Sequence, residues 1–372
     1  MKRLLAPPIL AIGARIATKG SEGNKSTLLS LPIPGTNNSK KKPAMRAKTI
    51  VTTVVMGVLL LVASPAWSAY LRNMPVTVKQ PDGTEIKCFA SGDEFHNWLH
   101  DEANYTIIPH PRTGWYCYAE PSGDDVVAGP LVVGRDLPQS RNLVPGINIS
   151  PALYRQYSQS RFFLPEDSKA PTIGLINNIV IFIRFADDPE FGQEIIYYNG
   201  LFNVNANSQR EYYLEASYDQ LTVYSYFYPP EVNGYVVSWQ DTLPRAYYQP
   251  YNEATNPDGY TTDKPAREWT LLRNAVTAVD PLIPSDLIVD GDNDSYVDNV
   301  VFVVQGSSGA WNSLLWPHRW GIWGQPIVYI NGKQVYNYNL QMQDFLSYSG
   351  VGVLSHEFFH SLGSPDLYHY QN

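Results

Sequence analysis

Residues 354–371 read LSHEFFHSLGSPDLYHYQ, and within them His356, Glu357 and His360 form the pattern His-Glu-x-x-His. In an α-helix, two histidines four residues apart lie on one face, one turn above the other. Their ring nitrogens can then bind a single metal ion, and Zn²⁺ suits imidazole ligands in a hydrolytic site. Glu357 is near enough to a water molecule on that ion to act as a general base. The pattern predicts a helix with a zinc site rather than an exposed helix with two incidental histidines.

The residues after the second histidine extend this pattern. Gly363 is expected to adopt a left-handed conformation and end the helix. Asp366 stands ten residues after His356, where the pattern H-E-x-x-H-x-x-G-x-x-H has its third ligand, and an aspartate oxygen is an accepted zinc donor. The predicted zinc ligands are therefore His356, His360 and Asp366, with Glu357 as the catalytic base. The alternative is a third ligand, a glutamate, that lies beyond residue 372.

The opposite face of the predicted helix is apolar. At about 100° per residue, four apolar side chains cluster away from the two histidines. They are Val351, Leu354, Phe358 and Leu362. We expect this face to pack against the core while the other face binds the metal.

The stretch from His356 to Tyr368 closely resembles the active-site segment of the immune inhibitor A family of secreted bacterial zinc metallopeptidases. Three other segments are similar to that family: residues 210–218 (REYYLEASY), the loop 290–298, and residues 316–320 (WPHRW). The resemblance implies a metzincin-like catalytic domain, with a mixed twisted sheet and backing and active-site helices in an α+β or α/β arrangement. It also implies that a small β-rich propeptide domain precedes this domain.

The same resemblance implies a function and a missing part. A methionine turn and a C-terminal subdomain should follow the zinc stretch, but the sequence ends six residues after Asp366, so we expect a truncated catalytic domain. The implied function is a secreted zinc-dependent endopeptidase made as a zymogen, with proteins or peptides as substrates and its own propeptide as a partner. The alternative is a non-catalytic secreted calcium-binding or adhesion module that retains a truncated zincin fold.

A second candidate metal site lies in the loop 290–298. Carboxylates stand at positions 1, 3, 5 and 9 of an EF-hand-like pattern, and a backbone carbonyl is available at position 7. These candidate Ca²⁺ ligands are Asp290, Asp292, Asp294, Asp298 and the carbonyl of Tyr296. Ser295 replaces the usual glycine and Val301 replaces the usual glutamate, so the alternative is a solvated acidic turn. Because four close carboxylates repel one another, we expect a structural Ca²⁺ ion.

The N-terminal region predicts export. A basic start at Met45, an apolar run over 50–63 and a small-residue end describe a signal peptide, and the run is shorter than the ~20 residues of a membrane span. The expected segments are an extension or mis-assigned start (1–44), the signal peptide (45–68), a propeptide and linker (69–169) and the catalytic domain (170–372). With a formal net charge of −8, the chain should bind neither nucleic acid nor, once the signal is cleaved, a membrane.

Two cysteines and one more histidine have open roles. Cys88 and Cys117 are expected to form a disulfide after export, and the alternative is a propeptide thiolate that caps the zinc. His318 could line the cleft and contact substrate, or it could be a packed histidine in an aromatic corner. Residues 338–345 are expected to form the strand that borders the cleft.

Several other elements follow from local patterns. Residues 178–185 predict a strand buried on both faces. Helices are expected at 207–218 and, with Asp263 as the cap, at 263–279, and a short helix could begin at 91–95 and carry Leu99. Asn331-Gly332 predicts a hairpin between 327–330 and 333–336.

Overall fold

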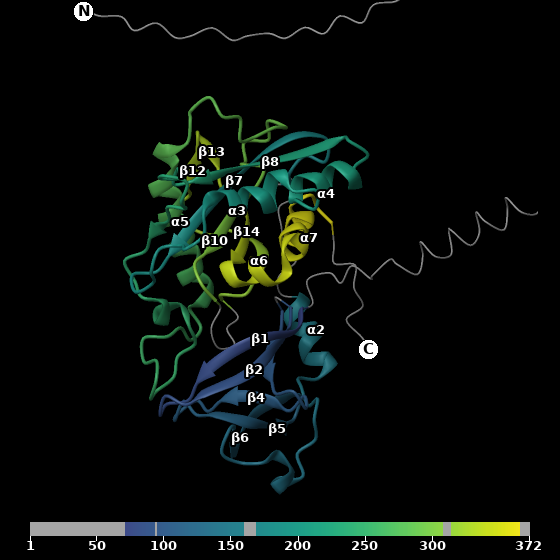
Figure 1. The fold of residues 1–372 in the computed structure, drawn as a ribbon, viewed down its shortest axis with the longest axis vertical. Coiled ribbons are helices and arrows are strands. Elements are labelled where there is room, and N and C mark those ends of the chain that lie inside the picture. Colours follow the sequence, from purple (N-terminus) through teal and green to yellow (C-terminus); the bar gives the residue numbers. More distant parts are fainter. Residues whose placement is uncertain (1–70, 94, 160–168, 308–313, 365–372) are drawn as a thin grey trace, which may run out of the picture. The chain divides into compact units, whose positions relative to one another are not determined.

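The computed structural model describes residues 71–93, 95–159, 169–307 and 314–364, which form a mixed α+β chain (Figure 1). The predicted extension, the signal peptide and Asp366 lie outside the described residues. Among the described helices, none combines the length and apolar character that a membrane-spanning segment requires.

The described residues between 71 and 132 form an antiparallel sheet of six strands in the order β1-β2-β3-β4-β5-β6. The strands are β1 (Leu71–Lys79), β2 (Glu85–Gly92), β3 (Asn97–His100), β4 (Thr106–Pro109), β5 (Tyr116–Ser122) and β6 (Asp125–Val132). The 3-10 helix η1 (Pro138–Arg141) and the helix α2 (Pro151–Gln159) follow. This part of the chain is β-rich, as the sequence predicts for residues 69–169.

A second, mixed sheet is built from the later part of the chain, and within the described residues its order is β11-β14-β10-β7-β8, with β9 beside β7. Its strands are β7 (Gly174–Arg184), β8 (Leu221–Tyr228), β9 (Trp239–Gln240), β10 (Val300–Val304), β11 (His318–Gly321) and β14 (Asn337–Met342). β7, β8, β10 and β14 run parallel, whereas β11 is antiparallel to β14.

Helices connect these strands and cover the sheet (Figure 1). They are α3 (Ile195–Asn199), the π-helical turn η3 (Gly200–Val204), α4 (Gln209–Ala216), the 3-10 turn η4 (Arg245–Tyr248), α5 (Lys264–Val279), the 3-10 turn η5 (Asp280–Leu282), α6 (Gln343–Ser349) and α7 (Val351–Ser361). The short strands β12 (Tyr329–Ile330) and β13 (Lys333–Gln334) pair as the predicted hairpin, with Asn331 and Gly332 at positive φ. The asparagine-glycine turn therefore behaves as its local chemistry requires.

The central strand β7 shows how the sheet is covered on both sides. Ile179, Ile181 and Ile183 share a buried cluster with residues of α5. The alternate residues Val180 and Phe182 share another cluster with residues of α3, α6 and α7. Because successive side chains of a strand point to opposite faces, α5 covers one face and α7 covers the other. The predicted doubly buried strand is thus confirmed.

The helix expected from residues 91–95 onward does not form. Residues 91–92 end β2, and residues 97–100 form β3. Asp93 accepts hydrogen bonds from the amides of Phe95 and His96 at 3.0 and 2.9 Å, which makes a turn between the strands. Leu99 pairs with Ala90 on one side and with Ile107 on the other. Pairing on both edges outweighs the local helical pattern.

The predicted disulfide is not formed in this structure. Cys88 lies on β2 and Cys117 on β5, and both are buried, free thiols among the described residues. β3 and β4 lie between the two strands in the order of the sheet, so β2 and β5 are not paired. Burial raises the pKa of Cys88 to about 12 and also raises the pKa of Cys117. Without a metal ion, the neutral thiol is therefore favoured at both positions.

Candidate metal centre

Helix α7 carries the His-Glu-x-x-His pattern and ends as the sequence predicts. Gly363 has φ +90°. The amide of Gly363 donates to the carbonyl of His360 at 2.9 Å, and the amide of Ser364 donates to that of Phe359 at 3.2 Å. These two bonds form a Schellman motif, which satisfies the last carbonyls of the helix and turns the chain back. The turn brings the Ser364 carbonyl next to His360.

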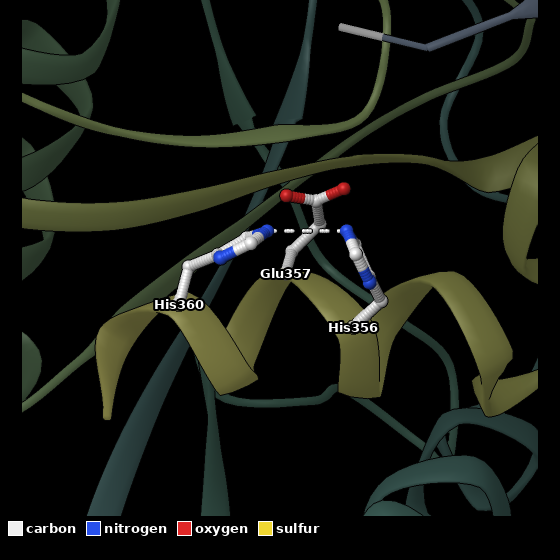
Figure 2. A group of neighbouring side chains, drawn as sticks. All are labelled: His356, Glu357 and His360. Atoms are coloured by element: carbon white, nitrogen blue, oxygen red, sulfur yellow. Dashed lines mark hydrogen bonds between the residues drawn. The ribbon is translucent and has the colours of Figure 1, made fainter. Parts of the chain in front are cut away.

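The two histidine rings face each other across one turn of α7 (Figure 2). Their Nε2 atoms are 3.1 Å apart. Two nitrogens on one tetrahedral Zn²⁺ are about 3.3 Å apart when each Zn–N bond is about 2.05 Å. The Nδ1 atom of His360 lies 2.8 Å from the Ser364 carbonyl, which only a protonated Nδ1 can use as an acceptor. With Nδ1 protonated, the lone pair of His360 is on Nε2, where it accepts a hydrogen bond from Nε2 of His356; a metal ion between the two rings would take the place of that bond.

The carboxylate of Glu357 lies on the same side of the helix as the two rings (Figure 2). His356, Glu357 and His360 each offer a ligand atom, and these atoms all lie within 4.8 Å of one another. Glu357 is 1 % exposed, and within the described part of the chain neither of its carboxylate oxygens has a hydrogen-bond partner. A buried carboxylate is costly without a partner, so this group fits a nearby cation and its water.

The apolar face of α7 packs as predicted. Leu354 and Phe358 are fully buried, Leu354 against β7 and β10 and Phe358 against Tyr213 of α4. Tyr213 also donates a hydrogen bond from its hydroxyl to the carbonyl of Ser355 at 2.5 Å. These contacts hold the helix so that its polar face remains available.

The prediction that residues 338–345 form the strand that borders the cleft is wrong. β14 lies inside the sheet, between β10 and β11, and the residues after Met342 belong to α6. β11 is the outer strand at this end of the sheet in the described chain. The local pattern of β14 could not reveal this, because edge and interior strands differ in their partners rather than in their own residues.

His318 does not lie beside the metal-binding face of α7. It is 2 % exposed, and its Nε2 lies 2.8 Å from Oε1 of Glu268 on α5, which packs on the other face of the sheet. Tyr338 of β14 donates a hydrogen bond to the same carboxylate oxygen. The structure therefore places His318 in a packed aromatic environment, as in the second of its two interpretations.

Arg319, the next residue on β11, occupies the opposite face and is not among the predicted site residues. It pairs with Asn339, whose side-chain amide donates to the Leu354 carbonyl of α7 at 3.3 Å. Its Nη2 donates to Oδ1 of Asn337 at 2.6 Å. Burial lowers the pKa of Arg319 to about 10, while charges that include Glu357 oppose the shift. Successive side chains of a strand point to opposite faces, so a buried His318 on one face would have placed Arg319 on the other.

Replacing His318 by leucine should destabilise the protein by about 3–5 kcal/mol, because the Glu268 carboxylate would stay buried without the imidazole that bonds to it. Burial opposes ionisation of Glu268, but the His318 charge and hydrogen bonds from His318 and Tyr338 lower its pKa overall. Urea unfolding measures the loss. The double variant His318→Leu/Glu268→Met is the control and should recover most of it. If the free energy of unfolding of His318→Leu lies within about 1 kcal/mol of the wild-type value, this role of His318 is contradicted.

The acidic loop brings together only part of the predicted calcium ligands. Asp290, Asp292 and Asp294 have carboxylate oxygens within 4.8 Å of one another. Nζ of Lys333 lies 2.5 Å from Oδ2 of Asp290 and supplies a positive charge to this group. The backbone amide of Tyr296 donates to Oδ1 of Asp294 at 2.7 Å. This arrangement gathers three carboxylates at one point, as a cation site requires.

Asp298 does not belong to this group of three carboxylates, but its charge interacts with all of them. Both of its oxygens accept hydrogen bonds from the amide of Gly291 at 3.1 Å. Burial, opposed by those bonds and reinforced by the charges of Asp292, Asp290 and Asp294, raises the pKa of Asp298 to about 7. The loop therefore carries a carboxyl group that ionises only at considerable cost.

Comparison with protein-family models finds no match to this chain. Comparison with curated protein sequences also finds none. Function is therefore inferred from the side chains of α7 and from the sheet beneath them.

Proposed function

We propose that this chain is a secreted zinc-dependent endopeptidase made as a zymogen, and that its fold is metzincin-like. One observation carries the proposal: the buried Glu357 carboxylate, which no described residue hydrogen-bonds, lies beside two histidines whose Nε2 atoms are 3.1 Å apart. The mixed sheet, with an antiparallel outer strand β11 and the helix α7 against its face, is compatible with such a fold. The resemblance of residues 356–368 to the immune inhibitor A family supports the same assignment.

His356 and His360 would hold the Zn²⁺ ion through Nε2, with Asp366, or a glutamate beyond residue 372, as the third ligand. When bound, the ion supplies Lewis-acid activation of a water molecule and of the scissile carbonyl. Glu357 accepts the proton of the attacking water and then passes it to the leaving amine. Because Glu357 is buried, its carboxylate is shielded from bulk water.

Substrate binding is proposed at β11. This strand pairs with β14 on one side, and no described strand pairs with its other side. An extended peptide can pair with such an edge through main-chain hydrogen bonds. A peptide on the edge of β11 would then have its scissile bond between the helix and the strand.

The test of the proposed function combines metal content with casein hydrolysis by the full chain and by its processed form. We expect about one zinc per chain, loss of hydrolysis with 1,10-phenanthroline, and recovery on adding Zn²⁺. Protein that contains no zinc, or that cleaves no peptide after removal of residues 69–169, would contradict the proposal.

We also propose Ca²⁺ in the acidic loop, in a structural role. The three gathered carboxylates and the elevated pKa of Asp298 support a cation there. The alternative function, a non-catalytic calcium-binding or adhesion module, also requires a cation in this loop, but it does not require Glu357 as a base. Peptide hydrolysis distinguishes the two functions, because only the peptidase cleaves peptides.

Removal of Ca²⁺ with EGTA should lower the melting temperature, and more at pH 8 than at pH 6. The pKa of Asp298 is about 7 in the folded chain and near its ordinary value of 3.8 when unfolded. The folded state therefore holds this proton more tightly, and without a cation stability falls as pH rises through this window. Differential scanning calorimetry measures the change. Ca²⁺, added with saturating Zn²⁺ as the control for EGTA's zinc affinity, should restore the melting temperature, and Asp292→Asn should weaken this response. An EGTA effect that Zn²⁺ alone reverses contradicts a calcium site.

A further inference from the structure

A fully buried chain of polar side chains crosses the sheet beneath α7. Asn203 Oδ1 accepts a hydrogen bond from the Ser225 amide at 2.8 Å, and the hydroxyl oxygen of Ser225 accepts one from the Asn178 side chain at 2.9 Å. Oδ1 of Asn178 accepts from the Asn299 side chain at 2.7 Å. Oδ1 of Asn299 accepts from the hydroxyl of Ser361 at 2.8 Å. All five residues are at most 2 % exposed.

The last member of this chain belongs to the metal helix. Ser361 follows His360 directly and is the final residue of α7. Its carbonyl accepts a further hydrogen bond from the amide of Ala170 at 2.9 Å. Asn299 directly precedes β10 and directly follows Asp298 of the acidic loop. The C-terminal turn of α7 is therefore joined to the sheet by a hydrogen bond between two residues that are 0 % exposed.

Apolar packing alone does not set the rotation of α7. The contacts of Leu354 and Phe358 are non-directional, and a helix can turn or slide by a fraction of a residue while keeping most of such contacts. A hydrogen bond is directional and loses strength steeply when its angle changes. Buried polar pairs can for that reason specify one register of packed elements.

We propose that the Asn299–Ser361 hydrogen bond positions His360 for metal binding by fixing the rotation of the last turn of α7 on the sheet. The inference rests on the proposed metal site and concerns its geometry rather than its turnover. Ser361 and Asn299 are positioning residues, because neither contacts the metal ligands' nitrogens in the proposed scheme. They act through the backbone of the turn that carries His360.

Cobalt binding by the full chain tests this inference. Co²⁺ takes the place of Zn²⁺, and its visible absorption reports the geometry of its ligands. We expect Ser361→Ala to weaken Co²⁺ binding about tenfold or more, the range found when groups that orient metal ligands are removed. We also expect its visible spectrum to shift. Titration followed by absorption gives both quantities without any need for peptide hydrolysis.

Two control variants separate positioning from general loss of stability. Ser355→Ala removes the same hydroxyl from the same helix, and the Ser355 hydroxyl has no hydrogen-bond partner among the described residues. Ser225→Ala removes the other hydroxyl of the buried chain, which accepts the Asn178 hydrogen bond, so it should lower the melting temperature about as much as Ser361→Ala. Both controls are expected to bind Co²⁺ within about twofold of wild type, with an unchanged spectrum.

Three results would overturn the inference: a wild-type affinity and spectrum for Ser361→Ala, equal changes in Ser225→Ala, or a wild-type chain that binds no Co²⁺. If Ser361→Ala does not fold, Asn299→Asp gives the test. It keeps the oxygen that accepts from Ser361 and loses the amide that donates to Asn178, so its spectrum should remain that of wild type, and a shifted spectrum contradicts the inference. A wild-type chain that binds Co²⁺ but cleaves no peptide would contradict the proposed function and leave this inference standing.

Discussion

Glu357→Gln is expected to retain zinc and to lose casein hydrolysis by about 10²–10⁴-fold, the range attributed to a positioned general base. Glutamine has nearly the same shape as glutamate but cannot accept the proton of the attacking water. Because Glu357 is not a predicted ligand, His356 and His360 should still hold the ion. Metal analysis and the rate of casein hydrolysis, measured on the same preparation, check both parts.

Glu215→Gln is the matched control for this substitution. Glu215 is exposed on α4 and has no role in the proposed mechanism, so its variant should hydrolyse casein at the wild-type rate. Full activity in Glu357→Gln would contradict the assignment of Glu357 as the general base. Loss of zinc together with activity would instead make Glu357 a metal ligand, which contradicts the proposed division of roles.

His360→Ala is expected to reduce zinc affinity by more than about 100-fold, since a lost direct ligand costs at least as much as the loss of a group that orients one. His360 offers its Nε2 to the metal and is held by its Nδ1 bond to the Ser364 carbonyl, so alanine removes both the ligand atom and the bond that orients it. Isothermal titration with Zn²⁺ measures the change. Peptide hydrolysis should be lost in parallel.

His110→Ala is the control, because it removes one histidine that is not a proposed metal ligand. His110 lies in the turn between β4 and β5, and its ring accepts hydrogen bonds from nearby backbone amides. This variant should bind zinc like the wild type. Zinc affinity that is unchanged in His360→Ala would show that the ion is held elsewhere, and the helical metal site would have to be abandoned.

The local sequence was sufficient for the helix that carries the site. The spacing of His356 and His360, the apolar stripe beneath them and the left-handed Gly363 each depend on neighbours within one or two helical turns. Such preferences act before any tertiary contact forms. For the same reason the hairpin at Asn331-Gly332 was predictable, because a type I′ turn depends on only two residues.

Residues from distant parts of the chain decided the surroundings of the site. His318 and Arg319 are neighbours in sequence, yet only the pairing of β11 with β14 determines which one faces α7. A shift of one residue in that register would exchange their roles. The burial of Cys88 and Cys117 on strands that do not pair likewise depends on the order of the whole sheet.

The sequence by itself therefore determined the chemistry offered by α7, since helical periodicity and turn formation are local properties. Only the tertiary structure decided what faces that chemistry: an interior β14, an outer β11, Arg319 in place of His318, and a buried polar chain that ends at Ser361. These features depend on strand order and register, which arise from the simultaneous burial of many side chains and leave no signature in any single segment.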